Sequence, residues 1–131
     1  MKKITKTIAK KRAWKAFSLY IRMRDQRCVT CGVSEFLQAG HFIVGRHNSV
    51  LFDERNCHAQ CYGCNVGRKG NIVEYYPFMV TTYGQNVIDE LKLLDKKLVQ
   101  YKAQDYLDIE EKYKSKLDTG VSTTRHKRRK P

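Results

Sequence analysis

The sequence predicts a single α+β domain in which a small metal-stapled core of two strands and a short helix lies between flanking helices. The chain has 131 residues, the length of one domain. Two Cys-x-x-Cys pairs, Cys28/Cys31 and Cys61/Cys64, are separated by residues 32–60. Helical periodicity precedes the first pair and follows the second. We therefore place the core at about residues 28–71.

The domain is expected to span residues 7–118, between a basic disordered arm at 1–6 and a basic disordered tail at 119–131. Its first helix is predicted from about Thr7 to Arg24, because Trp14, Phe17 and Ile21 recur at helical spacing. The remaining elements are expected as strands at 38–44 and 50–58, a short helix at 61–70, and helices at 72–83, 86–98 and 105–117.

Basic residues are concentrated at the two ends of the chain. The net charge is +13, and residues 1–27 carry ten Lys or Arg against one acid. Such clustering suits a polyanion, since each neutralised phosphate releases counterions. A solubility tail or a ribosome-associated tail is the alternative. The candidate DNA contacts lie on the first helix and around the core: Lys10, Lys11, Arg12, Lys15, Arg46, Arg55, Arg68 and Lys69.

The four paired cysteines predict a structural zinc site. No apolar run long enough to span a membrane occurs, and no apolar stretch follows the first lysines as in a secretory signal. We therefore expect a cytoplasmic protein with reduced thiols. Two Cys-x-x-Cys turns complete a tetrahedral S4 site, which suits Zn²⁺ and leaves no open position for chemistry. The fifth cysteine, Cys57, is assigned to packing.

Residues suited to phosphodiester hydrolysis lie between and beside the cysteine pairs. They are His41, Asn56, His58 and Asn65. Hydrolysis needs a base for the attacking water and a cation for the developing charge. A histidine titrates near neutrality, and an amide oxygen is a ligand for Mg²⁺.

The order of these residues resembles the zinc-bearing HNH (His-Me finger) nucleases, whose core is a ββα-metal unit. The Asn that directly follows the last cysteine is similar to endonuclease VII. The strings Lys15–Arg22, Ala39–Phe42, Asn56–Cys61 and Gly70–Tyr75 resemble the NinG/Rap family of phage recombination endonucleases.

The resemblance implies a metal-dependent endonuclease that cuts branched DNA, such as Holliday junctions or D-loops. It implies that His41 is the general base, that Asn56 braces the loop holding that histidine, and that Asn65 binds Mg²⁺ or Mn²⁺. Because a four-way junction has two-fold symmetry, a homodimer is expected.

One departure concerns the residue before the histidine. Many HNH nucleases have an Asp there that helps to bind the metal, whereas this chain has Gly40. We expect His58 to replace it, since His58 lies two residues after Asn56 on a predicted strand and shares its face. Water could also fill the position, and three residues are weaker candidates: His47, Asp53 and Glu54.

Three other interpretations stay open. A non-catalytic, zinc-dependent DNA-binding protein would bind DNA without cutting, and Gly40 would mark a dead site. An HNH nicking or restriction-like enzyme would cut linear duplex at least as well as branched DNA. A ribosomal-type treble-clef protein that binds RNA accounts for the zinc and the charge, but not for the spacing of His41, Asn56 and Asn65.

Overall fold

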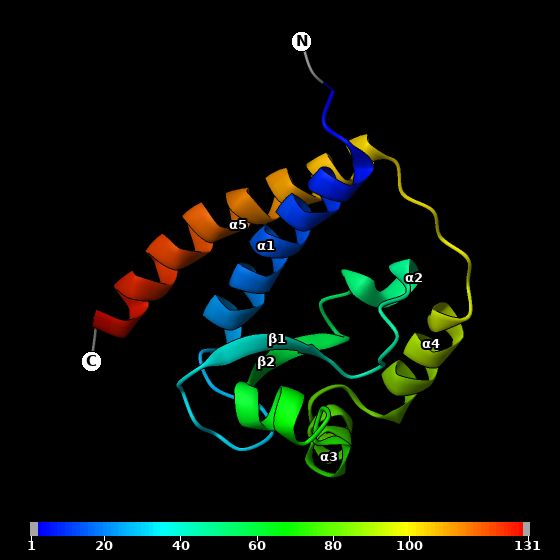
Figure 1. Ribbon diagram of the computed structural model, residues 1–131. Helices are drawn as coiled ribbons and strands as arrows, with labels where there is room; N and C mark the ends of the chain where they lie inside the picture. The colour runs from blue at the N-terminus through cyan, green and yellow to red at the C-terminus, as the bar shows by residue number, and fades with distance from the viewer. Residues whose placement is uncertain (1–2, 130–131) are drawn as a thin grey trace.

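The computed structural model describes residues 3–129, and the side chains of residues 3–119 (Figure 1). The α+β class is confirmed, with a single two-stranded sheet in the described part of the chain. The elements are α1 (Lys6–Asp25), β1 (Leu37–His41), α2 (Asn48–Leu51), β2 (Cys57–Cys61), the π-helical turn η1 (Gly63–Gly67), α3 (Ile72–Tyr83), α4 (Gln85–Asp95) and α5 (Ala103–Arg129).

Helix α1 begins and ends with specific capping contacts. The Thr5 hydroxyl accepts a hydrogen bond from the Ile8 amide, 3.2 Å away. Gln26 ends the helix in the left-handed conformation, with φ of 63°. Its buried face is built from small residues near the start and large ones near the end, namely Ala9, Ala13, Ala16, Phe17 and Ile21. The predicted apolar face of α1 is therefore confirmed. The size of its residues determines how closely other elements approach the helix.

Helices α1 and α5 lie side by side and run in the same direction (Figure 1). Near their starts, Tyr106 packs against Ala9 and Ala13. Further along, Tyr113 packs edge-on against Phe17, with 4.9 Å between ring centroids. The small alanine side chains let a tyrosine ring pack closely against α1. Helices α1 and α5 therefore form one layer.

The two strands form an antiparallel ladder between the helical layers. Leu37 pairs with Cys61 and His41 pairs with Cys57. Because side chains alternate between the faces of a strand, Ala39 and Cys57 face α1, where both are buried in one cluster. Gly40 and its partner His58 face the opposite side.

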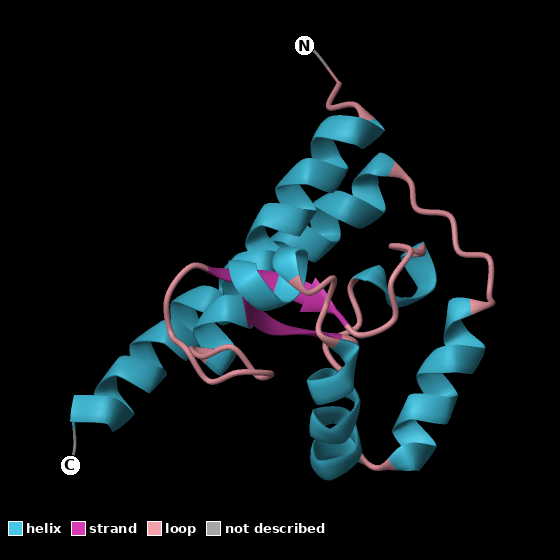
Figure 2. Ribbon diagram, turned by 60° about the horizontal axis from the view of Figure 1, so that its bottom comes forward, coloured by secondary structure: helices cyan, strands magenta, loops and turns pink. Residues whose placement is uncertain are grey.

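On the opposite side of the sheet, α3 reaches His58 of β2 through Tyr75 and Tyr83, and α4 packs against α3 (Figure 2). A second apolar cluster joins these helices to the end of β1, and contains Phe42, Val50, Tyr75, Met79, Ile88 and Leu91. No helix in residues 3–129 is long and apolar enough to cross a membrane.

The second strand was predicted too early in the chain. Residues 48–51 form α2, and the strand occupies Cys57–Cys61 instead of 50–58. Between them Asp53 organises a turn, since its carboxylate accepts from the Arg55 amide and its carbonyl accepts from the Asn56 amide. Asn56 therefore precedes the strand.

Other boundaries differ from the prediction as well, and α4 ends at Asp95 rather than at residue 98. The first strand ends at His41 rather than at residue 44, and the predicted short helix at 61–70 is reduced to η1, since Cys61 still belongs to β2. The last helix continues to Arg129 instead of ending at 117. The predicted basic tail at 119–131 lies mostly outside the residues whose side chains are described, and it stays a prediction.

Candidate functional site

The four paired cysteines form one cluster at the end of the ladder. Their sulfur atoms lie within 4.8 Å of one another. The Sγ atoms of Cys31 and Cys61 are 3.6 Å apart. In a tetrahedral zinc site with Zn–S bonds of about 2.3 Å, the sulfurs lie roughly 3.8 Å apart. The donor set and spacing therefore fit a metal such as zinc.

Hydrogen-bond donors surround the cluster as thiolates require. Asn71 donates to the Cys64 sulfur at 3.5 Å, and the Cys64 amide points at the Cys61 sulfur at 3.4 Å. The Thr30 hydroxyl lies 3.1 Å from the Cys28 sulfur. Burial opposes the Cys28 thiolate, but the hydrogen bonds from Thr30 and backbone amides lower the pKa of Cys28 to about 6. The remaining cysteine, Cys57, is fully buried in the core, as predicted.

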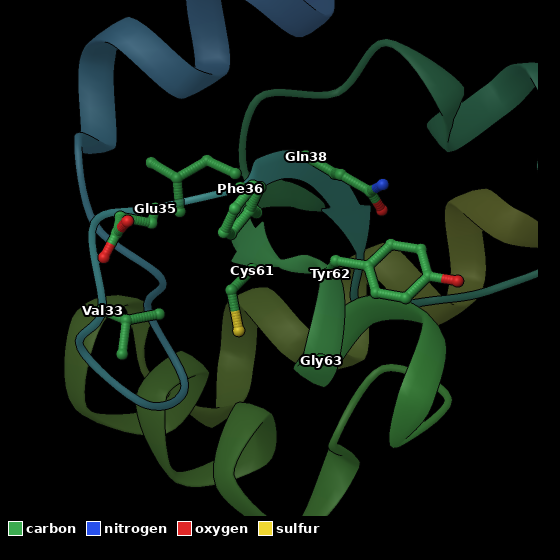
Figure 3. A pocket seen from close by; sticks show the side chains of 8 residues that line it. Val33, Glu35, Phe36, Gln38, Cys61, Tyr62 and Gly63 are labelled. Carbon is green, nitrogen blue, oxygen red and sulfur yellow. The ribbon is translucent and has the colours of Figure 1, made fainter.

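An apolar hollow lies beside this cluster. Val33 and residues 35–38 and 61–63 line it, and Figure 3 shows the rings of Phe36 and Tyr62 and the thiol of Cys61 around it. Its lining offers one ionisable group besides the cysteine and tyrosine, the Glu35 carboxylate. No histidine lines it, so the predicted chemistry belongs elsewhere.

His41 is the last residue of β1 and has a defined tautomer. Its Nε2 lies 3.0 Å from the Leu51 carbonyl oxygen. A carbonyl only accepts hydrogen bonds, so Nε2 carries the proton and Nδ1 carries the lone pair. In residues 3–119, Nδ1 has no hydrogen-bond partner. The imidazole is thus held by one nitrogen and free to accept a proton at the other.

Two side chains fix the His41 ring and its charge state. The Trp14 ring stacks on it, with centroids 5.2 Å apart, and the Arg46 guanidinium lies 4.6 Å over the Trp14 ring. Burial lowers the pKa of His41 below its ordinary value, and Arg46 acts in the same direction, while the Leu51 carbonyl offsets part of the effect. The ring is therefore neutral at pH 7, as a base must be.

Asn56 lies beneath the loop that follows His41. Its side chain is fully buried. The amide oxygen accepts from the Ile43 amide at 2.8 Å, and the amide nitrogen donates to the carbonyls of Ile43 and Val50, each at 3.3 Å. These bonds tie the end of β1 to α2, whose Leu51 carbonyl holds His41. This is the geometry that a bracing role requires.

Asn65 reaches the sheet from η1. Its amide nitrogen donates to Gln38 Oε1 at 2.8 Å. Its Oδ1 lies 2.9 Å from the point that a Cβ on Gly40 would occupy. The Asn65 oxygen is therefore directed at the residue next to His41, on the other face of the strand.

His58 does not join Asn65 as a metal ligand, contrary to our prediction. Its ring is buried, Nδ1 lies 3.0 Å from the Tyr75 hydroxyl, and Nε2 lies 2.7 Å from the Tyr83 hydroxyl. Burial lowers its pKa to about 4, so the ring is neutral. Both nitrogens are used by tyrosines of α3, and no sequence pattern indicated that these hydroxyls would reach the strand.

The weaker ligand candidates are also engaged elsewhere. His47 Nδ1 lies 2.8 Å from Asp95, on α4. The Asp53 carboxylate pairs with Arg55 at 2.9 Å. Glu54 accepts from Tyr20, Tyr113 and Lys116. Each of the two carboxylates is already paired with a cation, and the histidine with a carboxylate, so none of the three is available beside Asn65.

A groove with basic walls runs along the start of α1 to Trp14. Its lining includes Lys6, Thr7, Lys10, Lys11, Trp14, Arg46, Asn48 and Tyr106. Trp14 is half-buried, with one edge in this groove and one face on His41. The groove therefore reaches Trp14, whose ring stacks on the predicted base, and Trp14 is more than the core residue that its helical spacing predicts.

The other predicted DNA contacts divide into exposed cations and cations paired with carboxylates. Lys15, Arg68 and Lys69 are exposed. Arg12 is bound to Glu110 by two contacts of 3.0 and 3.2 Å, and Arg55 is bound to both Asp53 and Glu90. Phosphate would have to displace these carboxylates, so the structure does not favour Arg12 and Arg55 as DNA contacts.

Comparison with known proteins places this chain. A family model described as "Bacteriophage Lambda NinG protein" matches residues 2–120. The chain belongs to the NinG family. It is 33% identical over 112 residues to protein ninG of Escherichia phage 933W, covering 82% of this chain and 55% of that protein. The same identity and coverage hold for protein ninG of Salmonella phage P22.

Protein ninG of Escherichia phage lambda is 36% identical over 87 residues, covering 63% of this chain and 43% of that protein. The chain thus spans about half the length of the NinG relatives it matches. No solved structure matches it.

Proposed function

We propose that this NinG-family protein is a metal-dependent endonuclease of phage recombination, built on a zinc-stapled HNH core, that cuts branched DNA. The observation that carries the proposal is the state of His41. Its Nε2 proton is committed to the Leu51 carbonyl, and its Nδ1 lone pair is unpartnered among the described residues. A neutral imidazole held in this way is prepared to take a proton.

The mechanism follows from the positions of the side chains. His41 Nδ1 accepts a proton from the water that attacks phosphorus, and the hydrogen bond from Nε2 to Leu51 keeps the ring oriented as its charge changes. Asn56 holds α2, which contains this carbonyl, by donating to the neighbouring Val50 carbonyl. Asn65 would hold Mg²⁺ or Mn²⁺, which supplies charge for the phosphoryl transition state and the leaving 3′ oxygen.

The basic groove supports DNA as the substrate. Lys10, Lys11 and Arg46 line it beside Trp14, so a phosphate backbone in the groove would be led to His41. The preference for branched DNA rests on the resemblance to the recombination endonucleases. Two copies of the chain would match the two-fold symmetry of a four-way junction.

The test compares wild-type protein, His41→Ala and His47→Ala on a labelled four-way junction and on linear duplex of the same sequence. His47 is a matched control, since it is an exposed histidine on the following loop that contacts Asp95. We expect His41→Ala to bind the junction and to cut at least about 100-fold more slowly. The control should cut normally, and EDTA should stop cleavage. Equal cleavage by wild type and His41→Ala would contradict the proposal.

A second candidate is a zinc-dependent DNA-binding protein without catalysis. Gly40 favours it, because no carboxylate stands beside His41 where HNH nucleases have one. In that case all three proteins would bind the junction, and none would cut with Mg²⁺ or Mn²⁺.

A further inference from the structure

Gln60 is a fully buried side chain with an unsatisfied oxygen. It lies on β2, and its amide nitrogen donates to the Gly70 carbonyl at 2.8 Å and to the Thr30 hydroxyl at 3.2 Å. The amide cannot be flipped, since its oxygen would then face the Gly70 carbonyl. Oε1 must point away from both, and it has no hydrogen-bond partner among the described residues. A buried amide oxygen without a partner is costly.

The unsatisfied oxygen is directed at Gly40. A Cβ built on Gly40 would lie 2.0 Å from Gln60 Oε1 and 2.9 Å from Asn65 Oδ1. Gln60 thus occupies the space into which an acidic side chain at position 40 would project. Only glycine at position 40 leaves room for the Gln60 amide, and this gives Gly40 a reason other than a dead site.

The two amide oxygens converge with no donor between them among the described residues. Asn65 has its nitrogen committed to Gln38, just as Gln60 has its nitrogen committed to Gly70. A positive centre beside Gly40 would satisfy both oxygens. Oxygen donors of this kind suit Mg²⁺ and Mn²⁺, which take one or two protein ligands and complete their shells with water and phosphate.

We infer that Gln60 Oε1 is the second protein ligand of the divalent cation, together with Asn65 Oδ1, in place of the acid that Gly40 lacks. The inference rests on the proposed function and names the residue that completes its metal site. Because both ligands are neutral, the scissile phosphate must supply the negative charge. The cation is therefore bound weakly by the free protein and more tightly when DNA is bound.

Side-chain amide NMR of zinc-loaded, ¹⁵N-labelled His41→Ala protein tests this directly, because this variant keeps DNA intact. Mn²⁺ is added with and without the four-way junction. We expect the NH₂ signals of Gln60 and Asn65 to broaden first, and at lower Mn²⁺ when the junction is bound. The Gln104 signal is the control, since Gln104 lies on α5 and bonds Asp108. Broadening of Asn65 without Gln60, or of neither, overturns the inference.

Gly40→Ala and Gln60→Leu provide a second measurement, by Mn²⁺ electron spin resonance. The added Cβ must displace Oε1, and leucine removes the oxygen, so each variant should bind Mn²⁺ about tenfold more weakly. Gln104→Leu is the matched control, and zinc content and circular dichroism check folding. Unchanged Mn²⁺ affinity in a folded variant overturns the inference. If the wild type cuts DNA with metal, but the Gln60 signal does not broaden and Gln60→Leu keeps its Mn²⁺ affinity, this inference is wrong and the proposed function stands. If Gln60 binds Mn²⁺ and nothing is cut, the proposed function fails alone.

Discussion

Replacing Asn56 with aspartate removes two hydrogen-bond donors without changing the shape of a buried side chain. The native amide nitrogen donates to the carbonyls of Ile43 and Val50, and the oxygen accepts from the Ile43 amide. Asn56→Asp keeps the acceptor. It places a second oxygen against two carbonyls, which have no proton to offer.

The cost follows from these three bonds. Each lost hydrogen bond contributes about 1 kcal/mol, and two carbonyls left without donors add to the loss, so we expect a lower free energy of unfolding by roughly 2–4 kcal/mol. A protonated carboxyl restores one donor. Burial and the facing carbonyls therefore raise the pKa of the carboxyl introduced by Asn56→Asp, in the folded variant, above its unfolded value of about 3.9.

The sign of the pH dependence follows from that shift. Below the unfolded pKa the carboxyl is protonated in both states, and only the loss of one donor remains. As pH rises toward the folded pKa, the unfolded state releases its proton first, so the variant loses up to about 1.4 kcal/mol per pH unit relative to wild type. Above the folded pKa the loss is constant.

Urea unfolding of zinc-saturated protein at several pH values between about 5 and 8 measures this, with wild type at each pH as the reference. Asn56→Ala is the control, because it loses both donated bonds as well as the bond accepted from the Ile43 amide, and it cannot titrate. If Asn56→Asp follows Asn56→Ala at every pH, or is as stable as wild type at neutral pH, then the bracing geometry is wrong.

Four further predictions concern the site and its support. Cleavage should rise with pH through a pKa below the usual value of about 6.5 for histidine, because protonation of His41 removes the base. Arg46→Ala should move this acid limb of the pH–rate profile to higher pH, since Arg46 lowers the pKa of His41. A limb unaffected by Arg46→Ala would contradict the electrostatic assignment. Chelation of the metal should unfold the protein, as followed by circular dichroism with one zinc released per chain, and a zinc-free protein with unchanged melting temperature would refute the structural role. Tyr75→Phe should lower the free energy of unfolding by about 1–3 kcal/mol, since the Tyr75 hydroxyl donates to a buried carbonyl of β1 at 2.8 Å; denaturant titration showing no loss would mean that this bond is dispensable. The double variant Lys10→Ala/Lys11→Ala should weaken DNA binding on any sequence and reduce the salt slope by up to about 2, and an unchanged slope would place the DNA elsewhere.

Features with a local cause could be predicted from the sequence. The two cysteine pairs identified the metal cluster because the ligands within each pair are three positions apart. Helices α1 and α3 follow from periodicity, and both begin within about a residue of the prediction. Asn56 and Asn65 were singled out only through the family resemblance, because an asparagine in the sequence does not by itself indicate a functional role.

Features set by long-range contacts could not be predicted. Arg12 was counted as a free cation because its partner, Glu110, lies at the far end of the chain. His58 was expected to share a strand face with Asn56, but Asn56 precedes β2, and the two tyrosine hydroxyls that satisfy the His58 ring come from α3. Nothing in the sequence distinguished Gln60, which stands beside Cys61, as a functional residue. Its importance appears only in the strand register, which brings it to the backbone of Gly40.

The pairing of α1 with α5 also constrains the order in which the protein folds. The alanine face near Ala9 is covered by Tyr106, and Phe17 is covered by Tyr113. On the ribosome, the zinc knuckles and the ladder emerge well before these tyrosines. The metal core can therefore assemble while the part of the first helix around Ala9 still exposes its apolar side. The packing of α5 on α1 then joins the most distant parts of the described chain. Such late contacts are slow to form, and until they form the exposed face is where nascent chains would stick to one another.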